Sequence, residues 1–127
     1  MSAFWQVLAI GFAGACGTLA RFGVNQFTAK ALGDYPYGTV IVNVAGCFLF
    51  GFLTSIFSAG RIGVQYKVIL LTGFLGGFTT FSAYAYEIAD FLEHQRYLAA
   101  LLHFGGQNVL GIAAVFLGLC FGKYIFV

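Results

Sequence analysis

Four long apolar stretches alternate with short polar ones along the chain. The apolar stretches cover about residues 3–22, 37–57, 68–91 and 98–121, and the loops between them lie at about 28–36, 58–66 and 93–97. A helix that crosses a membrane needs about 20 predominantly apolar residues, and each stretch is long enough. The pattern predicts an all-α membrane protein with four transmembrane helices in a single domain over residues 1–127.

The third apolar stretch is interrupted near its centre. Residues 72–82 read Thr-Gly-Phe-Leu-Gly-Gly-Phe-Thr-Thr-Phe-Ser. Gly lowers helix stability by about 1 kcal/mol relative to Ala, and Thr loses rotamer freedom in a helix. We therefore expect the third helix to break at residues 76–80. Open backbone at membrane depth is tolerated only where it is buried in protein or lines a polar cavity, and transporters place ions at such breaks.

Composition supports the membrane assignment and excludes several functions. The chain is 61% hydrophobic and 8% charged, whereas a soluble domain carries about 25% charged residues. The net charge of +2 is too small to imply a nucleic-acid partner. The sequence contains no Gly-rich phosphate loop, no Ser/His/Asp constellation and no His/Cys spacing typical of a metal site. We therefore expect no enzymatic activity and no catalytic residues.

Basic residues are distributed evenly over the two sides of the predicted bundle. Four spans put Arg61, Lys67 and Lys123 on the side of both termini. On the opposite side lie Arg21, Lys30 and Arg96. Because the Lys/Arg bias of the loops sets membrane orientation, this chain carries almost no orientation signal. Insertion in both orientations, and pairing into an antiparallel dimer, is the hypothesis that follows.

Few polar side chains lie inside the predicted spans, and each has two interpretations. Asn43 either makes an interhelical hydrogen bond or lines a pore as a donor. Arg21 either snorkels to the membrane surface or faces a polar vestibule. Phe81 and Tyr84 are spaced three apart and share a helix face, as ordinary core or lipid-facing aromatics do. Their positively polarised ring edges could also attract an anion.

The remaining polar groups lie nearer the helix ends or on the fourth stretch. Glu87 is expected at a solvated helix end beside Asp90 and Glu93, and His103 as an interfacial histidine. Asn108 lies too deep to snorkel and is expected to face other helices. No carboxylate lies deep in a span, although proton-coupled transport usually needs one. Hydrogen-bond donors and the carbonyls freed at the break suffice for a passive path for a small ion. They do not decide whether that ion is an anion or a cation.

The interrupted stretch also carries a resemblance to a known family. Residues 72–82, followed by Glu87, resemble the third-helix signature of the CrcB/Fluc fluoride channels. Three other segments are similar to the family's first, second and fourth helices. They are Gly11-x-x-Gly14-x-x-Gly17 followed by Arg21, Gly38-Thr39-x-x-x-Asn43-x-x-Gly46 and, more weakly, Asn108-x-x-Gly111. The likeness covers essentially the whole chain.

The resemblance implies a passive channel that exports fluoride across a bacterial inner membrane. It implies a dual-topology, antiparallel homodimer with two pores, and a structural sodium ion held by the backbone carbonyls of Gly76 and Thr79. Arg21 would lie near the vestibule. The implied pore residues are Asn43, Thr80, Phe81, Ser82, Tyr84 and Asn108. Tyr84 departs from the family, which usually has Phe there, and Ala83 lacks a hydroxyl that the family often has.

Two other functions compete with a fluoride channel. A proton-coupled drug exporter of the small multidrug resistance type also has four spans and a similar length, but it needs a membrane-central Glu in the first span. The first span here contains no acidic residue. The second alternative is a structural subunit that packs through its stripes of small residues, such as Gly11, Gly14 and Gly17. A fluoride electrode that follows efflux from proteoliposomes separates these possibilities.

Overall fold

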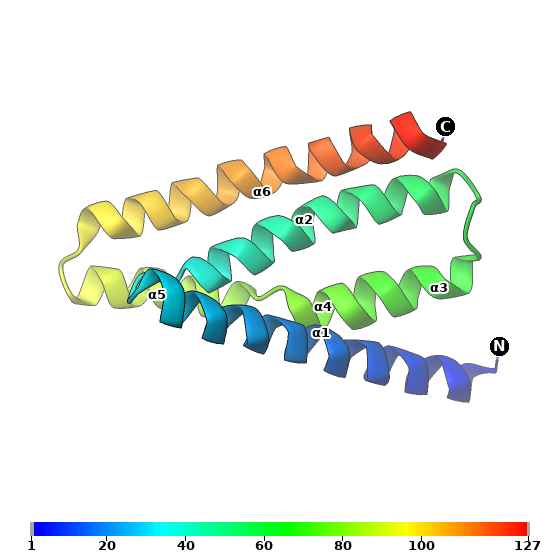
Figure 1. The fold of residues 1–127 in the computed structure, drawn as a ribbon, viewed down its shortest axis with the longest axis horizontal. Coiled ribbons are helices and arrows are strands. Elements are labelled where there is room, and N and C mark those ends of the chain that lie inside the picture. Colours follow the sequence, from blue (N-terminus) through cyan, green and yellow to red (C-terminus); the bar gives the residue numbers. More distant parts are fainter. Residues whose placement is uncertain (1, 127) are drawn as a thin grey trace.

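The chain folds into four long helical rods that lie side by side, with both ends of the chain at the same end of the bundle (Figure 1). A computed structural model describes residues 2–126. Helix α1 spans Ala3–Leu32, α2 spans Tyr37–Ser58 and α6 spans Tyr97–Phe126. The third rod is segmented into α3 (Val64–Val68), the π-helix η1 (Ile69–Leu75), α4 (Gly76–Phe78) and α5 (Phe81–Glu93). The prediction of an all-α membrane protein with four spans and a broken third helix is confirmed.

The first helix continues through residues that the sequence pattern assigned to a loop. Residues 28–32 are helical, and the loop before α2 is confined to residues 33–36. The Thr28 hydroxyl donates to the carbonyls of Val24 and Asn25, at 2.9 and 3.1 Å, and the residue is buried beside Gly38. The helix ends at Gly33, whose φ of 85° suits glycine. Burial against α2 therefore overrides the polar composition that favoured a loop from residue 28.

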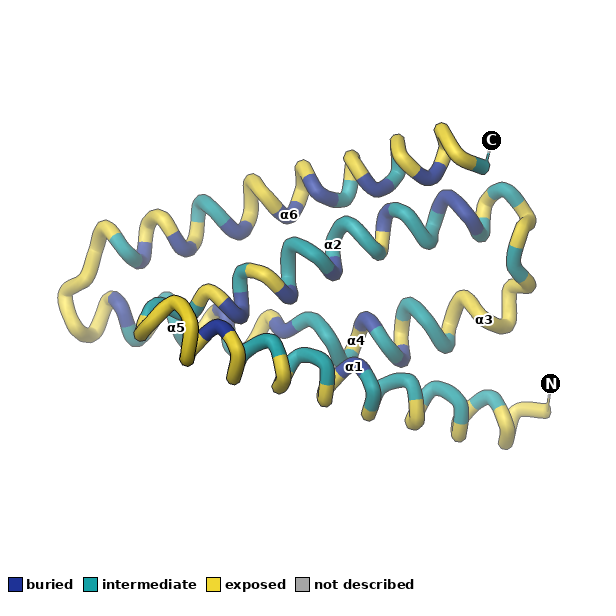
Figure 2. The backbone as a smooth tube through the Cα atoms, in the orientation of Figure 1, coloured by how far each residue is buried: buried dark blue, intermediate teal, exposed yellow. Residues whose placement is uncertain are grey.

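Helices α2 and α6 pack against each other along most of their length, through glycines that let the two backbones approach closely. A Cβ on Gly51 would lie 2.2 Å from the carbonyl oxygen of Val115, and one on Gly118 would lie 2.1 Å from that of Phe48. Small residues at helix crossings are typical of membrane proteins, where van der Waals packing drives association. The buried positions of both helices accordingly lie along their shared seam (Figure 2).

Helix α1 packs mainly against η1 and α4, so it supports the segmented rod rather than the α2–α6 pair. A Cβ on Gly17 would lie 2.1 Å from the carbonyl oxygen of Phe74. Gly14 approaches the carbonyl of Gly73 less closely, and Gly11 has no neighbour within 4 Å. The close approach near Gly14 depends instead on Gly77 of the opposing rod, where a Cβ would lie 2.4 Å from the Gly14 carbonyl oxygen.

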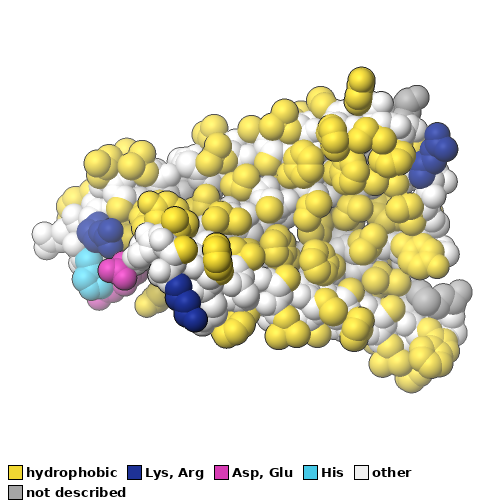
Figure 3. Space-filling view, viewed as in Figure 1, with side chains coloured by type: hydrophobic (Ala, Val, Ile, Leu, Met, Phe, Trp, Pro, Cys, Tyr) yellow, Lys and Arg dark blue, Asp and Glu magenta, His cyan; other side chains and the backbone are white. Residues whose placement is uncertain are grey.

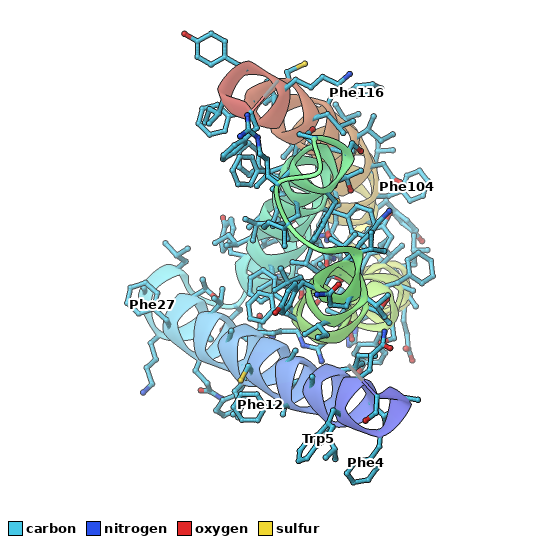
Figure 4. The ribbon with its side chains drawn as sticks, turned by 90° about the vertical axis from the view of Figure 1, so that its right-hand side faces the viewer. Phe4, Trp5, Phe12, Phe27, Phe104 and Phe116 are labelled. Atoms are coloured by element: carbon cyan, nitrogen blue, oxygen red, sulfur yellow. The ribbon has the colours of Figure 1, made fainter. Side chains whose placement is uncertain are left out.

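On the face seen in Figure 3, hydrophobic side chains are widespread, and the charged side chains lie toward the two ends of the bundle. Aromatic side chains of α1 and α6, including Phe4, Phe12, Phe104 and Phe116, point away from the bundle (Figure 4). Such a surface suits hydrocarbon rather than water. The fold therefore presents an apolar belt with polar ends, as a multi-pass membrane protein requires.

Candidate functional site: the broken third helix

The break is narrower than the glycine pattern suggested. Gly76–Phe78 are still helical, and only Thr79 and Thr80 adopt extended backbone, with φ/ψ of −86°/159° and −149°/115°. Thr80 caps the following helix, because its hydroxyl oxygen accepts from the N–H of Ala83 at 3.2 Å. The Thr79 hydroxyl donates back to the carbonyl of Leu75 at 2.9 Å. The two threonines therefore end one helix and begin the next.

Asn43 of α2 holds the opened backbone from one side. Its side-chain Oδ1 accepts from the N–H of Thr80 at 2.8 Å, and its Nδ2 donates to the carbonyl of Thr80 at 3.1 Å. The same Nδ2 donates to Oε1 of Gln107 on α6 at 2.8 Å. One amide thus replaces the helical acceptor that the Thr80 N–H has lost, adds a donor to the Thr80 carbonyl, and ties three rods together.

Arg21 of α1 reaches the break from the opposite side. Its guanidinium Nη1 donates to the carbonyl of Thr79 at 3.2 Å, and the side chain is half-buried. A cation here compensates a carbonyl that has lost its helical donor. The structure thus places Arg21 at the break itself, on the face of the segmented rod that packs against α1.

A cavity of about 390 Å³ opens beside the break, between α2, the segmented rod and α6. Most of the residues predicted from the sequence line it, namely Asn43, Gly76, Thr79, Thr80, Phe81, Tyr84 and Asn108. Ser82 lies next to it, and its hydroxyl pairs with that of Thr80 at 3.2 Å. Residues from three separate stretches of the chain thus meet at one hollow whose wall is mostly apolar and carries a few polar groups.

Two aromatic rings stand at the cavity with very different exposure. The Phe81 ring is 78% exposed, whereas Tyr84 is 8% exposed, and the two ring centroids lie 5.7 Å apart. The Tyr84 hydroxyl accepts from Nδ2 of Asn108 at 2.7 Å and donates to the carbonyl of Phe104 at 3.4 Å. The hydroxyl that distinguishes Tyr84 from phenylalanine therefore has a defined partner on α6.

A second polar hollow, of about 280 Å³, lies between α1, the loop before α2, and α5. Glu87 lines it together with Thr39, and Thr39 donates a hydrogen bond to the Glu87 carboxyl group. Sequence reasoning placed Glu87 at a solvated helix end and His103 at the interface. In the structure His103 is 1% exposed, and its Nε2 lies 2.9 Å from Oε2 of Glu87. The sequence did hold a signal, since Thr39 and Asn43, and likewise His103 and Gln107, are four apart and share a helix face.

Tyr35, in the loop before α2, completes this second group. Its hydroxyl lies 3.0 Å from Nδ1 of His103, and its ring stacks on Phe91. Burial raises the pKa of the Tyr35 hydroxyl above its ordinary value of 10.0, so the phenol stays protonated at neutral pH. Nothing in the sequence pattern singled out Tyr35, because its partner lies at a sequence separation of 68 residues.

Comparison with known proteins identifies the family. Residues 8–119 match the family described as CrcB-like protein, Camphor Resistance (CrcB). A protein of Solidesulfovibrio magneticus named fluoride-specific ion channel FluC is 46% identical over 121 residues, which cover 91% of this chain and 94% of that protein. Proteins of the same name from Nitratidesulfovibrio vulgaris and Nitrosococcus oceani are 42% and 43% identical, over 94% and 95% of this chain and 98% and 99% of theirs. The chain therefore belongs to the CrcB family.

Proposed function

We propose that this protein is a passive, fluoride-selective channel of the bacterial inner membrane. The names of its relatives support fluoride as the ion. The observation of this chain that carries the proposal is the cavity at the helix break, where hydroxyl groups and the exposed ring of Phe81 lie together beside an otherwise mostly apolar wall. Hydrogen fluoride crosses membranes as a neutral acid and ionises in the less acidic cytoplasm. A passive channel then lets fluoride leave, driven by the negative-inside potential.

Among the side chains at the cavity, the donors whose hydrogens are free to meet an anion are hydroxyls rather than amides. Both hydrogens of the Asn43 amide are engaged, by Thr80 and by Gln107, and those of Asn108 are engaged by Tyr84 and the carbonyl of Phe104. In the Thr80–Ser82 pair one hydroxyl donates to the other, so one hydrogen remains available. The hydrogen of Tyr84 is held only by a contact of 3.4 Å. We expect these hydroxyls and the Phe81 ring edge to replace the hydration of fluoride, with Asn43 and Asn108 positioning them.

We further propose that the working channel is an antiparallel homodimer with two fluoride paths. Free hydroxyl and carbonyl groups at a helix break are costly against lipid, because unsatisfied polar groups in hydrocarbon cost several kcal/mol each. A second copy that covers Phe81 would close the path. With Arg21 at the break, three basic residues remain on the side of the termini (Arg61, Lys67, Lys123) and two on the other side (Lys30, Arg96), and so small a bias supports an opposite orientation of the two copies. Labelling of single-cysteine variants from each side of the membrane tests this, since a single orientation would exclude the arrangement.

The backbone at the break also suits a structural sodium ion, which we propose is held by the carbonyls of Gly76 and Thr79. In a continuous helix the Gly76 carbonyl would accept from the N–H of Thr80, but that N–H donates to Asn43. The Gly76 oxygen therefore lacks its usual helical donor, and unwound carbonyls are the groups that coordinate sodium in transporters. The Thr79 carbonyl already accepts from Arg21, although a carbonyl oxygen has a second lone pair. Sodium would stabilise the opened turn.

Fluoride efflux from proteoliposomes, followed with a fluoride electrode, tests the proposed function. Rapid fluoride release, with chloride retained, is expected for the purified protein. Drug–proton antiport without fluoride release would instead indicate the small multidrug resistance type, and the absence of both fluxes would indicate a structural subunit. The Phe81→Ile variant, described in the Discussion, separates flux through the proposed path from leakage.

A further inference from the structure

The two polar hollows are joined by a chain of side-chain hydrogen bonds. Asn43 and Gln107 line the cavity at the break, whereas Thr39, Glu87 and Tyr35 line the second hollow. His103 connects the two groups. Its Nε2 lies 2.8 Å from Nε2 of Gln107 and 2.9 Å from Oε2 of Glu87, and its Nδ1 lies 3.0 Å from the Tyr35 hydroxyl. The positions of the hydrogens along this series of hydrogen bonds can be deduced, because Asn43, at one end of the series, is hydrogen-bonded to the backbone of Thr80.

The backbone of Thr80 determines which way the Asn43 amide points. A backbone N–H can only donate and a backbone carbonyl can only accept. Oδ1 of Asn43 must therefore face the N–H of Thr80, and Nδ2 must face its carbonyl. A flipped amide would set two donors against each other and two acceptors against each other. Asn43 consequently presents a donor, Nδ2, to Gln107.

The orientation of Gln107 follows from that of Asn43. Its Oε1 must accept from Asn43, so its Nε2 faces the imidazole of His103 and donates toward Nε2 of that ring. A nitrogen that accepts this bond carries no hydrogen. The ring proton of a neutral His103 then lies on Nδ1 and is donated to the Tyr35 hydroxyl.

The carboxyl group of Glu87 faces the same bare nitrogen. An ionised carboxylate and a nitrogen lone pair would repel each other at 2.9 Å, whereas a protonated carboxyl group would donate to the nitrogen and share its single lone pair with the N–H of Gln107 in a three-centre bond. The other oxygen, Oε1, accepts from Thr39, as the carbonyl oxygen of a carboxylic acid would. The opposite arrangement, an imidazolium beside a carboxylate, would set an N–H of the ring against the N–H of Gln107 at 2.8 Å.

We propose that Glu87 and His103 together form a site that binds one proton, held on Oε2 of Glu87, with His103 neutral and protonated on Nδ1. Burial favours this neutral pair, because two ionised groups would lose more hydration than a hydrogen-bonded acid and imidazole do. His103 is enclosed by the rings of Tyr35, Tyr84 and Phe91, with centroids 5.6 to 5.7 Å away. The role of this site in conduction rests on the proposed function. A neutral Glu87 leaves no negative charge between the two hollows that would repel fluoride.

Other titratable or charged groups surround the site. Tyr35 approaches it from the loop before α2 and Tyr84 from α5. Asp34 lines the same hollow as Glu87. The guanidinium carbon of Arg96 lies 4.8 Å from the centre of the Phe91 ring, and that ring in turn packs against His103. Arg21 donates to the carbonyl of Thr79 at the break. Within residues 2–126, none of the side-chain hydrogen bonds of His103 is with a lysine, arginine or aspartate. The hydrogen-bond pattern itself therefore controls where the proton lies.

Nitrogen-15 solid-state NMR of the histidine rings in proteoliposomes tests the site directly. The chain has two histidines, and the other, His94, is exposed, so a His94→Gln variant leaves the His103 ring as the single signal. At neutral pH we expect a protonated Nδ1 and a bare Nε2. Two protonated nitrogens, or a proton on Nε2 alone, would overturn the assignment.

A Glu87→Gln change in the same single-histidine background provides the matched variant. The glutamine amide can donate to Nε2 and its oxygen can accept from Thr39, so the two His103 signals should keep their protonation pattern. If Glu87 were ionised and held His103 as an imidazolium, the substitution would remove the ring's second proton. Infrared spectra give a second readout, since a carboxylic-acid band present in the parent should vanish in Glu87→Gln, and a parent that lacks the band would exclude a protonated Glu87. Neither measurement involves fluoride, so a failure of the proposed transport function would appear separately, as absent efflux.

Discussion

The side chain of Asn43 accepts a hydrogen bond from the backbone N–H of Thr80 and donates one to the backbone carbonyl of the same residue. A residue in the middle of one membrane helix thereby supplies the acceptor that the backbone N–H of Thr80 has lost at the break in another helix. The extended backbone of Thr79 and Thr80 is stable at membrane depth because Asn43 and Arg21 compensate its polar groups.

The Asn43 contact predicts a large effect of Asn43→Asp. The carboxylate keeps the shape of the amide, but it offers no donor to the Thr80 carbonyl or to Gln107. We expect a loss of unfolding free energy of about 1–3 kcal/mol, the cost of leaving buried polar groups unpaired, together with a loss of fluoride efflux. Thermal unfolding in detergent measures the first effect. Thr54→Val is the control on the same helix, because the exposed Thr54 hydroxyl bonds only to the Phe50 carbonyl of its own helix. Equal stability of the two variants would contradict the role of Asn43.

The packing of α1 predicts opposite outcomes for two chemically identical substitutions. Gly17→Ala would place a Cβ 2.1 Å from the Phe74 carbonyl and force α1 away from η1, at a cost of about 1–3 kcal/mol typical of overpacking. Gly11→Ala meets nothing within 4 Å, so better helix propensity should leave stability equal or raise it by up to about 1 kcal/mol. Melting temperatures of the two variants in the same detergent compare them. A second copy packed on Gly11 would be indicated if that variant were equally destabilised.

The two aromatic residues at the cavity should respond differently to substitution. Phe81→Ile removes the ring edge and should largely abolish fluoride efflux from proteoliposomes. Tyr84→Phe keeps the ring and should retain efflux, with a loss of about 1 kcal/mol in stability because Asn108 loses an acceptor. Phe116→Ile, on the outward face of α6, is the control for a general effect of losing a ring. Normal efflux in Phe81→Ile would disprove the role assigned to that ring.

Exchange of sodium for a large organic cation tests the proposed ion at the break. If the carbonyls of Gly76 and Thr79 hold sodium, its removal should lower the melting temperature, because an ion that binds only the folded state stabilises it by mass action. Arg21→Met frees the Thr79 carbonyl from its guanidinium and should lower the sodium concentration needed for half-maximal stabilisation. A melting temperature that does not depend on sodium in either protein would rule out a structural sodium ion.

The four spans and the break in the third could be predicted from the residues alone, because both depend on local physics. Each stretch of apolar residues is long enough for a helix to cross hydrocarbon, and a Gly-Gly-Phe-Thr-Thr run disfavours helix wherever it occurs. Local propensity was less informative about how far the break and the first helix extend. It predicted a break over residues 76–80 where only Thr79 and Thr80 are extended, and a loop from Thr28 where the helix continues to Leu32.

Which polar groups meet depends on the packing of the helices and could not be predicted from the residues. The partners Asn43 and Gln107 are separated by 64 residues, and Arg21 and Thr79 by 58, so no periodicity within one helix relates them. Glu87 looked like the solvated end of a helix and His103 like an interfacial residue. The crossing of α5 with α6, and the loop that carries Tyr35, bring these side chains together and remove them from the membrane surface. Hydropathy records how well a segment suits lipid, whereas the pairing of its few polar groups depends on how the helices rotate and cross as they pack.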